Sequence, residues 1–151
     1  MTMHARLSYA LLACTLFVSG CGDKPTSATG TSTTTTVSTA TAVAPAFTEI
    51  FDGKVPVNGS TFYSFTVTQY GTVNVTMTNV SGQFVPSTVT LGLRLGSPAA
   101  EDCAMATSLT TKAASTAQIT GAYQPGVYCV RVYDVGNLFS TANVKVQIDF
   151  P

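Results

Sequence analysis

After residue 46, apolar and polar residues alternate with a period of two along most of the chain. Alternation of this kind is typical of strands that bury one face and expose the other. Glycine, proline and asparagine separate the alternating runs at short intervals, as turns between strands require. The pattern therefore predicts strands at residues 47–52, 61–68, 72–79, 88–95, 102–109, 116–119, 127–133 and 142–150.

The same alternation predicts which side chains face the core and which face water. Threonines and asparagines at the alternate positions, Thr76 among them, are expected to point outward. Gly53 is expected to end the first run, Tyr70-Gly71 to turn the second run back on the third as a hairpin, and Gly96-Ser97-Pro98 to end the fourth. The residues expected to point inward are Tyr63, Phe65, Val67, Val73, Val75, Met77, Val89, Leu91, Leu93, Leu95, Tyr128, Val130, Val132, Val144, Val146, Ile148 and Phe150.

Seven or eight short strands within residues 47–151 favour a single all-β domain, an antiparallel β-sandwich. The composition agrees, because valine, threonine, tyrosine and phenylalanine are common in strands. Charged residues make up only 9% of the chain, against about 25% usually. The seven lysines and arginines equal the seven aspartates and glutamates in number, so we expect no basic face for nucleic acid.

The first twenty residues predict a signal peptide. Leu7–Val18 is a mostly apolar run that is too short to span about 30 Å of hydrocarbon as a helix. It ends in Val18-Ser19-Gly20-Cys21, which resembles a bacterial lipobox. That resemblance implies that residues 1–20 are removed and that acylated Cys21 anchors the chain in a membrane of the bacterial cell envelope. Gly22, in place of an aspartate, favours the outer membrane over the inner membrane.

Residues 21–46 are expected to form the lipidated cysteine and a disordered linker. From Thr26 to Thr41, twelve of the sixteen residues are serine or threonine. Apolar residues show no period here, so the segment cannot bury enough surface to offset the entropy lost on ordering it. A flexible linker over Gly22–Ala46 has a span of roughly 25–30 Å, which would hold a domain clear of the lipid headgroups.

Two of the four cysteines remain for a disulfide. Cys14 lies in the signal peptide and Cys21 is assigned to the lipid anchor, which leaves Cys103 and Cys129 in an oxidising compartment. We expect these two to be bonded, with a contribution of roughly 3–4 kcal/mol to stability in the chain-entropy account. The alternative is two separate buried thiols.

Three of the strand-forming runs resemble the bacterial pre-peptidase C-terminal domain in order and spacing. They are Thr61–Val67 (TFYSFTV), Gly71–Met77 (GTVNVTM) and Pro125–Tyr133 (PGVYCVRVY). The resemblance covers Phe47–Phe150 and implies a jelly-roll-like sandwich, of a kind often appended to secreted enzymes and sometimes aiding substrate binding or processing. Where members of that family often carry an Asp-rich segment that can hold calcium, this chain has Ser87–Leu95.

We expect no catalytic constellation and no cofactor, and interpret the chain as non-enzymatic. The single histidine, His4, leaves with the signal peptide, which excludes histidine-based triads and most zinc sites. Glu101 and Asp102 are adjacent, so on a strand they would point to opposite faces rather than work as an acid–base pair. Asp134 and Asn137 could supply oxygen ligands to calcium, but both are ordinary turn residues, and we expect no metal there.

Aromatic side chains outside the inward pattern leave a binding function open. Tyr70, Tyr123 and Tyr133 are the candidates for a ligand platform, and packing at the edge of the core is the alternative. The sequence therefore predicts a membrane-anchored envelope lipoprotein whose β-sandwich is an interaction module for an envelope protein. The alternative function is a carbohydrate-binding (glycan-binding) module on the cell surface. The off-pattern aromatics are Phe62, Tyr70, Phe84, Tyr123, Tyr133 and Phe139.

Overall fold

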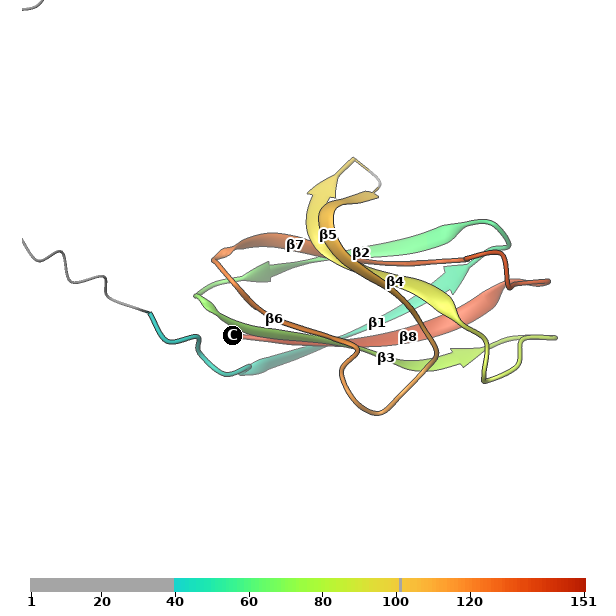
Figure 1. The fold of residues 1–151 in the computed structure, drawn as a ribbon, viewed down its shortest axis with the longest axis horizontal. Helices are drawn as coiled ribbons and strands as arrows, with labels where there is room; N and C mark the ends of the chain where they lie inside the picture. The colour runs from blue at the N-terminus through green and yellow to red at the C-terminus, as the bar shows by residue number, and fades with distance from the viewer. Residues whose placement is uncertain (1–39, 101) are drawn as a thin grey trace, which may run out of the picture. The chain divides into compact units, whose positions relative to one another are not determined.

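The computed structural model describes residues 40–100 and 102–151 of the chain. Eight strands form two four-stranded sheets, and no helix occurs among the described residues (Figure 1). This confirms the predicted all-β class. The strands are β1 (Phe47–Val55), β2 (Ser60–Val67), β3 (Gly71–Ser81), β4 (Leu91–Ala99), β5 (Asp102–Thr111), β6 (Ile119–Tyr123), β7 (Gly126–Tyr133) and β8 (Ala142–Phe150).

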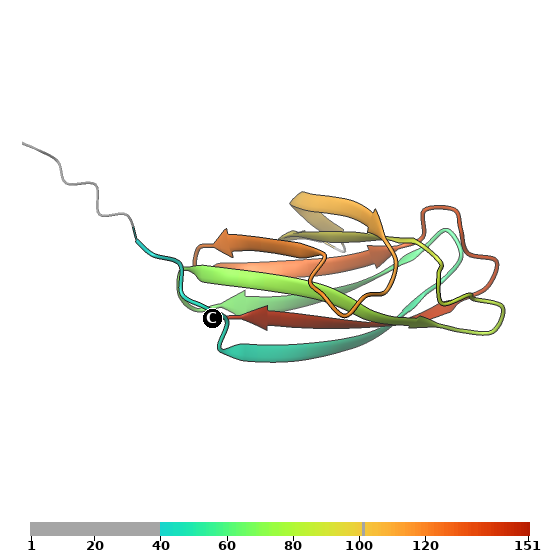
Figure 2. The ribbon, with the colours of Figure 1, turned by 60° about the horizontal axis from the view of Figure 1, so that its bottom comes forward.

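The two sheets are antiparallel and pack as a sandwich. Their strand orders are β1-β8-β3-β6 and β2-β7-β4-β5. Consecutive strands cross from one sheet to the other, except β4 and β5, which pair directly. This arrangement is a jelly roll, so the predicted antiparallel sandwich is confirmed. Figure 2 shows that the strands run lengthwise between two ends. We call the end where residues 40–46 enter the proximal end, and the opposite end the distal end.

The inner faces of the two sheets meet in one hydrophobic core, as the alternation predicts. Met77, Leu93 and Ile148 are completely buried, and every other residue expected to point inward is buried except two. Those two, Tyr63 and Tyr128, are half-buried and pack against the edge of the core. The inward pattern is therefore confirmed.

The predicted hairpin between the second and third runs is wrong. β2 pairs with β7, and β3 pairs with β6 and β8, so Tyr70-Gly71 carries the chain from one sheet to the other. Alternation determines which face of a strand is buried, but it carries no information about which strand lies beside it. In this fold the partners come from distant parts of the chain.

Two predicted strand ends are also wrong. Gly53 lies inside β1, where it leaves room for a ring, because a Cβ at this position would lie 2.6 Å from Phe51 Cζ. β4 continues through Gly96-Ser97-Pro98 with an irregular register. Pairing between β4 and β7 ends at Gly96, so Pro98 has a strand on one side only, and an edge position tolerates its missing N–H.

The sixth strand was predicted too early, at residues 116–119, whereas β6 is Ile119–Tyr123. The preceding residues follow β3 without forming a strand. The Ala114 N–H donates to Met77 O at 2.9 Å, and the Gln118 N–H donates to Val75 O at 3.0 Å. This stretch flanks Thr76, which is buried at 6% exposure although it was predicted to face water.

Residues 40–46 lie against the proximal end of the sandwich. Val43 forms a parallel bridge with Gly71, and its N–H donates to Tyr70 O at 3.1 Å. The Ala46 N–H donates to Phe150 O at 3.0 Å. The last residues assigned to the linker are thus hydrogen-bonded to the domain. The predicted signal peptide, the lipidation site Cys21 and the linker up to residue 39 lie outside the described residues.

Candidate functional site

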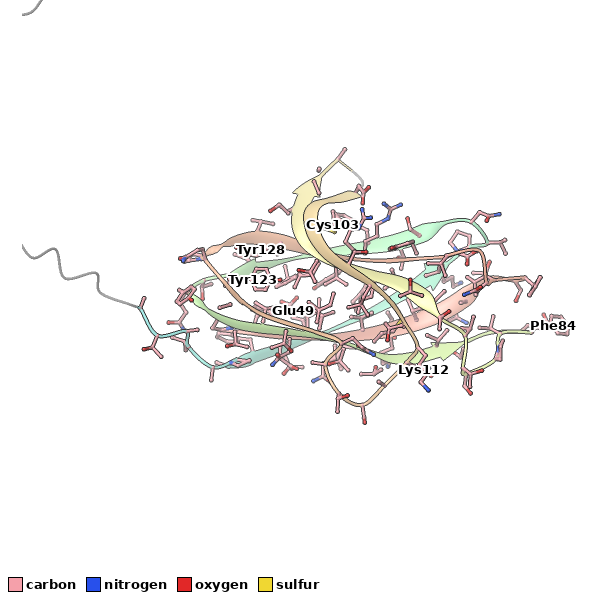
Figure 3. All side chains as sticks on the ribbon, viewed as in Figure 1. Glu49, Phe84, Cys103, Lys112, Tyr123 and Tyr128 are labelled. Carbon is pink, nitrogen blue, oxygen red and sulfur yellow. A yellow bond between two sulfur atoms is a disulfide. The ribbon has the colours of Figure 1, made fainter. Side chains whose placement is uncertain are left out.

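A disulfide joins Cys103 in β5 to Cys129 in β7, with an S–S distance of 2.13 Å and a Cα–Cα distance of 5.8 Å. The predicted pairing is confirmed. Cys129 belongs to the outer face of its sheet, because its neighbour Val130 points into the core. The bond therefore fastens the end of the β4–β5 hairpin, which curls away from the sandwich, to the outer face of β7 (Figure 3).

Beside the disulfide, the Asp102 carboxylate lies between two arginines. Its Oδ1 is 2.5 Å from Arg131 Nη1 and 3.6 Å from Arg94 Nη1. The hydrogen bond from Arg131, together with one from the Cys103 N–H, holds the pKa of Asp102 below its ordinary value of 3.8. The sequence analysis missed these arginines, because charged residues on separate strands give no local signal. The ion pair between Asp102 and Arg131 thus links the end of the β4–β5 hairpin to β7, in addition to the disulfide.

The half-buried Tyr133 packs against the same cluster. The guanidinium carbons of Arg94 and Arg131 lie 5.5 Å and 5.8 Å from the centre of its ring. Its hydroxyl lies 3.1 Å from Ser108 Oγ. A Cβ at Gly92 would lie 2.1 Å from Tyr133 Cζ, so the ring rests on the backbone of β4. The ring and the hydroxyl of this predicted ligand-binding residue thus already contact other groups of the protein.

The structure does not bring the three candidate tyrosines together. Tyr133 ends β7 at the distal end, whereas Tyr70 and Tyr123 lie at the proximal end, where Tyr123 is opposite Gly71. Tyr123 packs edge-to-face on Tyr128, with 5.1 Å between the ring centres (Figure 3). Only Tyr70 and Tyr123 are placed to share a surface.

Asp134 organises the loops at the distal end. Its Oδ1 accepts the backbone N–H groups of Gly136 and Asn137 at 2.9 Å and of Leu138 at 3.2 Å, and its Oδ2 accepts that of Asn58 at 2.8 Å. Desolvation raises the pKa of Asp134, but the four N–H donors outweigh it, and the pKa lies below the ordinary 3.8. The carboxylate proposed as a calcium candidate thus serves as a hydrogen-bond acceptor.

Metal-binding clusters are absent from the part of the chain that the structure describes. Residues 40–100 and 102–151 contain no group of three or more His, Cys, Asp or Glu side chains that could hold a metal ion. Asn137, the second calcium candidate, uses its side-chain amide to donate to Thr90 Oγ1 at 2.7 Å. Both calcium candidates therefore have a role in holding loops together.

A hollow of about 380 Å³ opens at the proximal end. Phe47, which is 58% exposed, forms one wall, and its ring centre lies 6.1 Å from that of Phe150. The Tyr63 hydroxyl donates to Glu49 Oε2 at 2.7 Å, and this hydrogen bond to a carboxylate raises the pKa of Tyr63. The lining residues are Phe47, Thr48, Glu49, Thr68 and Phe150. The sequence analysis missed this site, because it is assembled from three separate strand ends.

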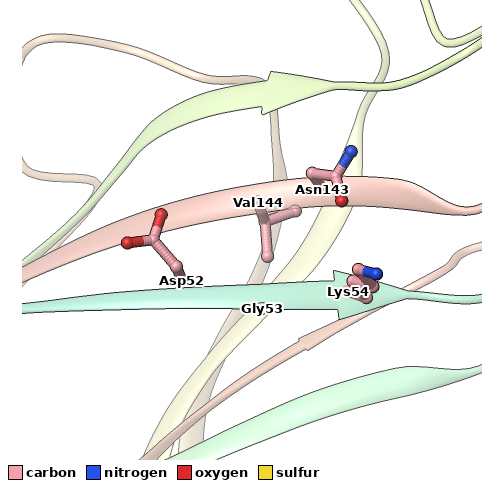
Figure 4. A pocket seen from close by; sticks show the side chains of 5 residues that line it. All are labelled: Asp52, Gly53, Lys54, Asn143 and Val144. Carbon is pink, nitrogen blue, oxygen red and sulfur yellow. The ribbon is translucent and has the colours of Figure 1, made fainter.

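A second, shallow hollow of about 310 Å³ lies over β1 and β8 (Figure 4). Its carboxylate, Asp52, lies 3.5 Å from Lys145 Nζ, and Lys54 points to solvent. Asp52 is the only carboxylate among the residues that line the hollow, and its nearest charged partner is the Lys145 ammonium, as in an ordinary exposed ion pair. The lining residues are Asp52, Gly53, Lys54, Asn143 and Val144.

Comparison with the models of known protein families finds no match to this chain, and comparison with curated proteins finds none either. Within residues 40–100 and 102–151, no helix is long and apolar enough to cross a membrane.

Proposed function

We propose that the chain is a non-catalytic lipoprotein of the bacterial cell envelope, anchored through acylated Cys21, whose sandwich is an interaction module. The disulfide between Cys103 and Cys129 carries the proposal, because structural disulfides form and persist in oxidising compartments outside the cytoplasm. Leu7–Val18 and the lipobox-like Val18-Ser19-Gly20-Cys21 supply the export and anchoring signals. The resemblance of Thr61–Val67, Gly71–Met77 and Pro125–Tyr133 to the pre-peptidase C-terminal domain implies a jelly-roll-like sandwich, and the interaction role proposed here follows from that resemblance.

Intact-mass measurement of the chain recovered from a bacterial envelope tests this function. We expect a protein that begins at Cys21, carries the added mass of acyl chains and fractionates with membranes. The Cys21→Ser variant is the control and should carry no lipid. An unmodified Cys21 in the exported wild-type chain would overturn the proposal. Separating the two membranes by density then tests the outer membrane, which Gly22 favours.

A glycan-binding module is the second candidate, and the proximal hollow favours it. The hollow combines an exposed aromatic ring, Phe47, with the Glu49 carboxylate, and these are groups on which a sugar can stack and form hydrogen bonds. A glycan array tests it, with Phe47→Ala and Tyr70→Ala expected to lose binding. Val127→Ala, at a 54% exposed valine outside the hollow, is the control and should keep it. A folded wild-type protein that binds no glycan would exclude this function.

A further inference from the structure

Three loops meet at the distal end of the sandwich. They are residues 56–59 between β1 and β2, 82–90 between β3 and β4, and 134–141 between β7 and β8. The strand pairs β1–β8, β2–β7 and β4–β7 all reach this end, so the loops lie together. We call their exposed apolar side chains the distal tip: Val57, Phe84, Val135 and Phe139.

The two phenylalanines of the distal tip are almost completely exposed. Phe84 is 81% exposed and Phe139 is 92% exposed, and Figure 3 shows Phe84 projecting from the far end of the molecule. Phe84 also has a φ of 61°, in the left-handed region that bulky residues rarely adopt. A strained conformation that presents a ring to solvent contributes no packing to the fold, which points to a function for the ring.

Hydrogen bonds between the loops hold the two rings in place. The Ser140 hydroxyl donates to Gln83 O, which joins the residues next to Phe139 and Phe84. Within the β3–β4 loop, the Val85 N–H donates to Gly82 O at 3.3 Å. The carbonyl groups of Gly82 and Gln83 are thus already paired beside Phe84, and a paired backbone group can enter an apolar medium without being left unsatisfied.

The charges near the distal tip suit an anionic lipid surface. The only charged residue in the three loops is Asp134, whose carboxylate accepts four backbone N–H groups. Lys54, one residue before the end of β1, is exposed and makes no ion pair with any described residue. A neutral apolar tip with a cation behind it matches acyl chains that lie beneath anionic headgroups.

We propose that the distal tip inserts its two phenylalanines into the headgroup–acyl boundary of an anionic lipid bilayer. Two aromatic side chains bury roughly 150–250 Å² each, whereas a stable protein interface buries about 800 Å² per partner. The tip is therefore small for a second copy of the chain or for a folded partner, but a bilayer can surround two projecting rings. The inference deepens the proposed function by naming what the sandwich contacts, and it rests on that function for the presence of a nearby membrane.

The absence of tryptophan from the chain makes a direct test possible. The single variants Phe84→Trp and Phe139→Trp are made in the full chain and mixed with vesicles of phosphatidylglycerol and phosphatidylethanolamine whose acyl chains carry bromine. Ile50→Trp and Val127→Trp are matched controls, because these residues are 57% and 54% exposed on the outer faces of the two sheets. We expect blue-shifted, bromine-quenched emission from positions 84 and 139 only.

Several results would overturn the inference. They are unquenched emission from both tip positions in folded protein, equal quenching at position 50, or a dimer of the chain whose interface is the distal tip. Lys54→Gln should lower the affinity for the anionic vesicles, read from the quenching titration, about fivefold. Equal binding to vesicles of phosphatidylcholine alone would remove the role given to Lys54. The intact mass of the exported chain tests the lipid anchor at Cys21 independently, so an error in the proposed anchor can be distinguished from an error in the proposed insertion of the distal tip.

Discussion

Two features of Phe84 are unfavourable for folding. Its backbone is left-handed, with a φ of 61°, and the residue is 81% exposed to water. We predict that Phe84→Gly stabilises the protein by about 0.5–1 kcal/mol. Glycine adopts this conformation freely, while the left-handed region costs other residues about 1–2 kcal/mol, less the larger entropy that glycine loses on folding. Urea unfolding of the two proteins measures the difference.

Phe139→Gly is the matched control for that prediction. Phe139 is also highly exposed, at 92%, but its backbone φ is not positive, so the substitution relieves no strain. We expect it to leave stability unchanged or to lower it by up to about 1 kcal/mol. Equal shifts in the two variants would mean that the conformation of Phe84 carries no strain.

Asp134 should make the stability of the fold depend on pH in the acid range. Its folded-state pKa is lowered from 3.8, chiefly by four backbone N–H donors acting against desolvation. A carboxylate with a lowered pKa contributes its full stability above the unfolded value, and this contribution is lost as the pH falls through the folded value. We therefore predict that Asp134→Asn costs about 1 kcal/mol at pH 7, since solvent partly screens this carboxylate, and progressively less as the pH falls below 3.8.

Denaturant unfolding of wild type and Asp134→Asn across that pH range measures the effect. The variant should keep part of the acid dependence, because the pKa of Asp102 is also lowered by its hydrogen bond from Arg131. A stability difference between the two proteins that stays constant from neutral to acid pH would show that the charge of Asp134 is not what stabilises the loops.

Among the secondary-structure elements, the β4–β5 hairpin depends most on a covalent bond. Beyond Gly96, β4 no longer pairs with β7. There the disulfide joins β5 to β7, between cysteines that are 26 residues apart in the sequence. We predict that Cys103→Ser with Cys129→Ser costs about 3–4 kcal/mol. Hydrogen exchange should increase first in residues 97–104. The Asp102→Asn variant, which keeps the disulfide, is the control and should affect the same segment less.

How far the sequence predicts these elements depends on what each element needs. The runs at 127–133 and 142–150 alternate cleanly, and β7 and β8 match them closely. The prediction of a hairpin at Tyr70-Gly71 was wrong, because the strands of a jelly roll pair with partners that are distant in the sequence. The predicted position of β6 was wrong, because Gln118 and the residues before it hydrogen-bond to β3 without forming a strand. Local pattern thus predicts strands and faces, while partners and edges require the tertiary structure.

The same division applies to the sites. The disulfide between Cys103 and Cys129 could be predicted by elimination, because only two cysteines remained. The sequence also marked Phe84 and Phe139 as aromatics outside the inward pattern, but only the strand register places their loops at one end. The proximal hollow had no sequence signal, since Phe47, Thr68 and Phe150 are contributed by separate segments.

For the molecule as a whole, the C-terminal strand should contribute far more to stability than the residues before Val43. β8 lies between β1 and β3, and its inward residues Val144, Val146, Ile148 and Phe150 are buried. Four such side chains contribute about 1.5–3 kcal/mol each, which is comparable with the whole net stability of a domain, about 5–15 kcal/mol. We predict that a chain ending at Thr141 shows no cooperative thermal unfolding.

A chain that begins at Val43 is the counterpart of that truncation, because it keeps the bridge to Gly71 and every strand. Its melting temperature, followed by far-UV circular dichroism, should stay within about 4 °C of the full chain, which corresponds to a change below about 1 kcal/mol. Cooperative unfolding of the chain that ends at Thr141 would show that the sandwich is stable although the strand between β1 and β3 is missing. That outcome conflicts with the complete burial of the inward residues Val146 and Ile148, whose removal would leave the middle of the core open to water.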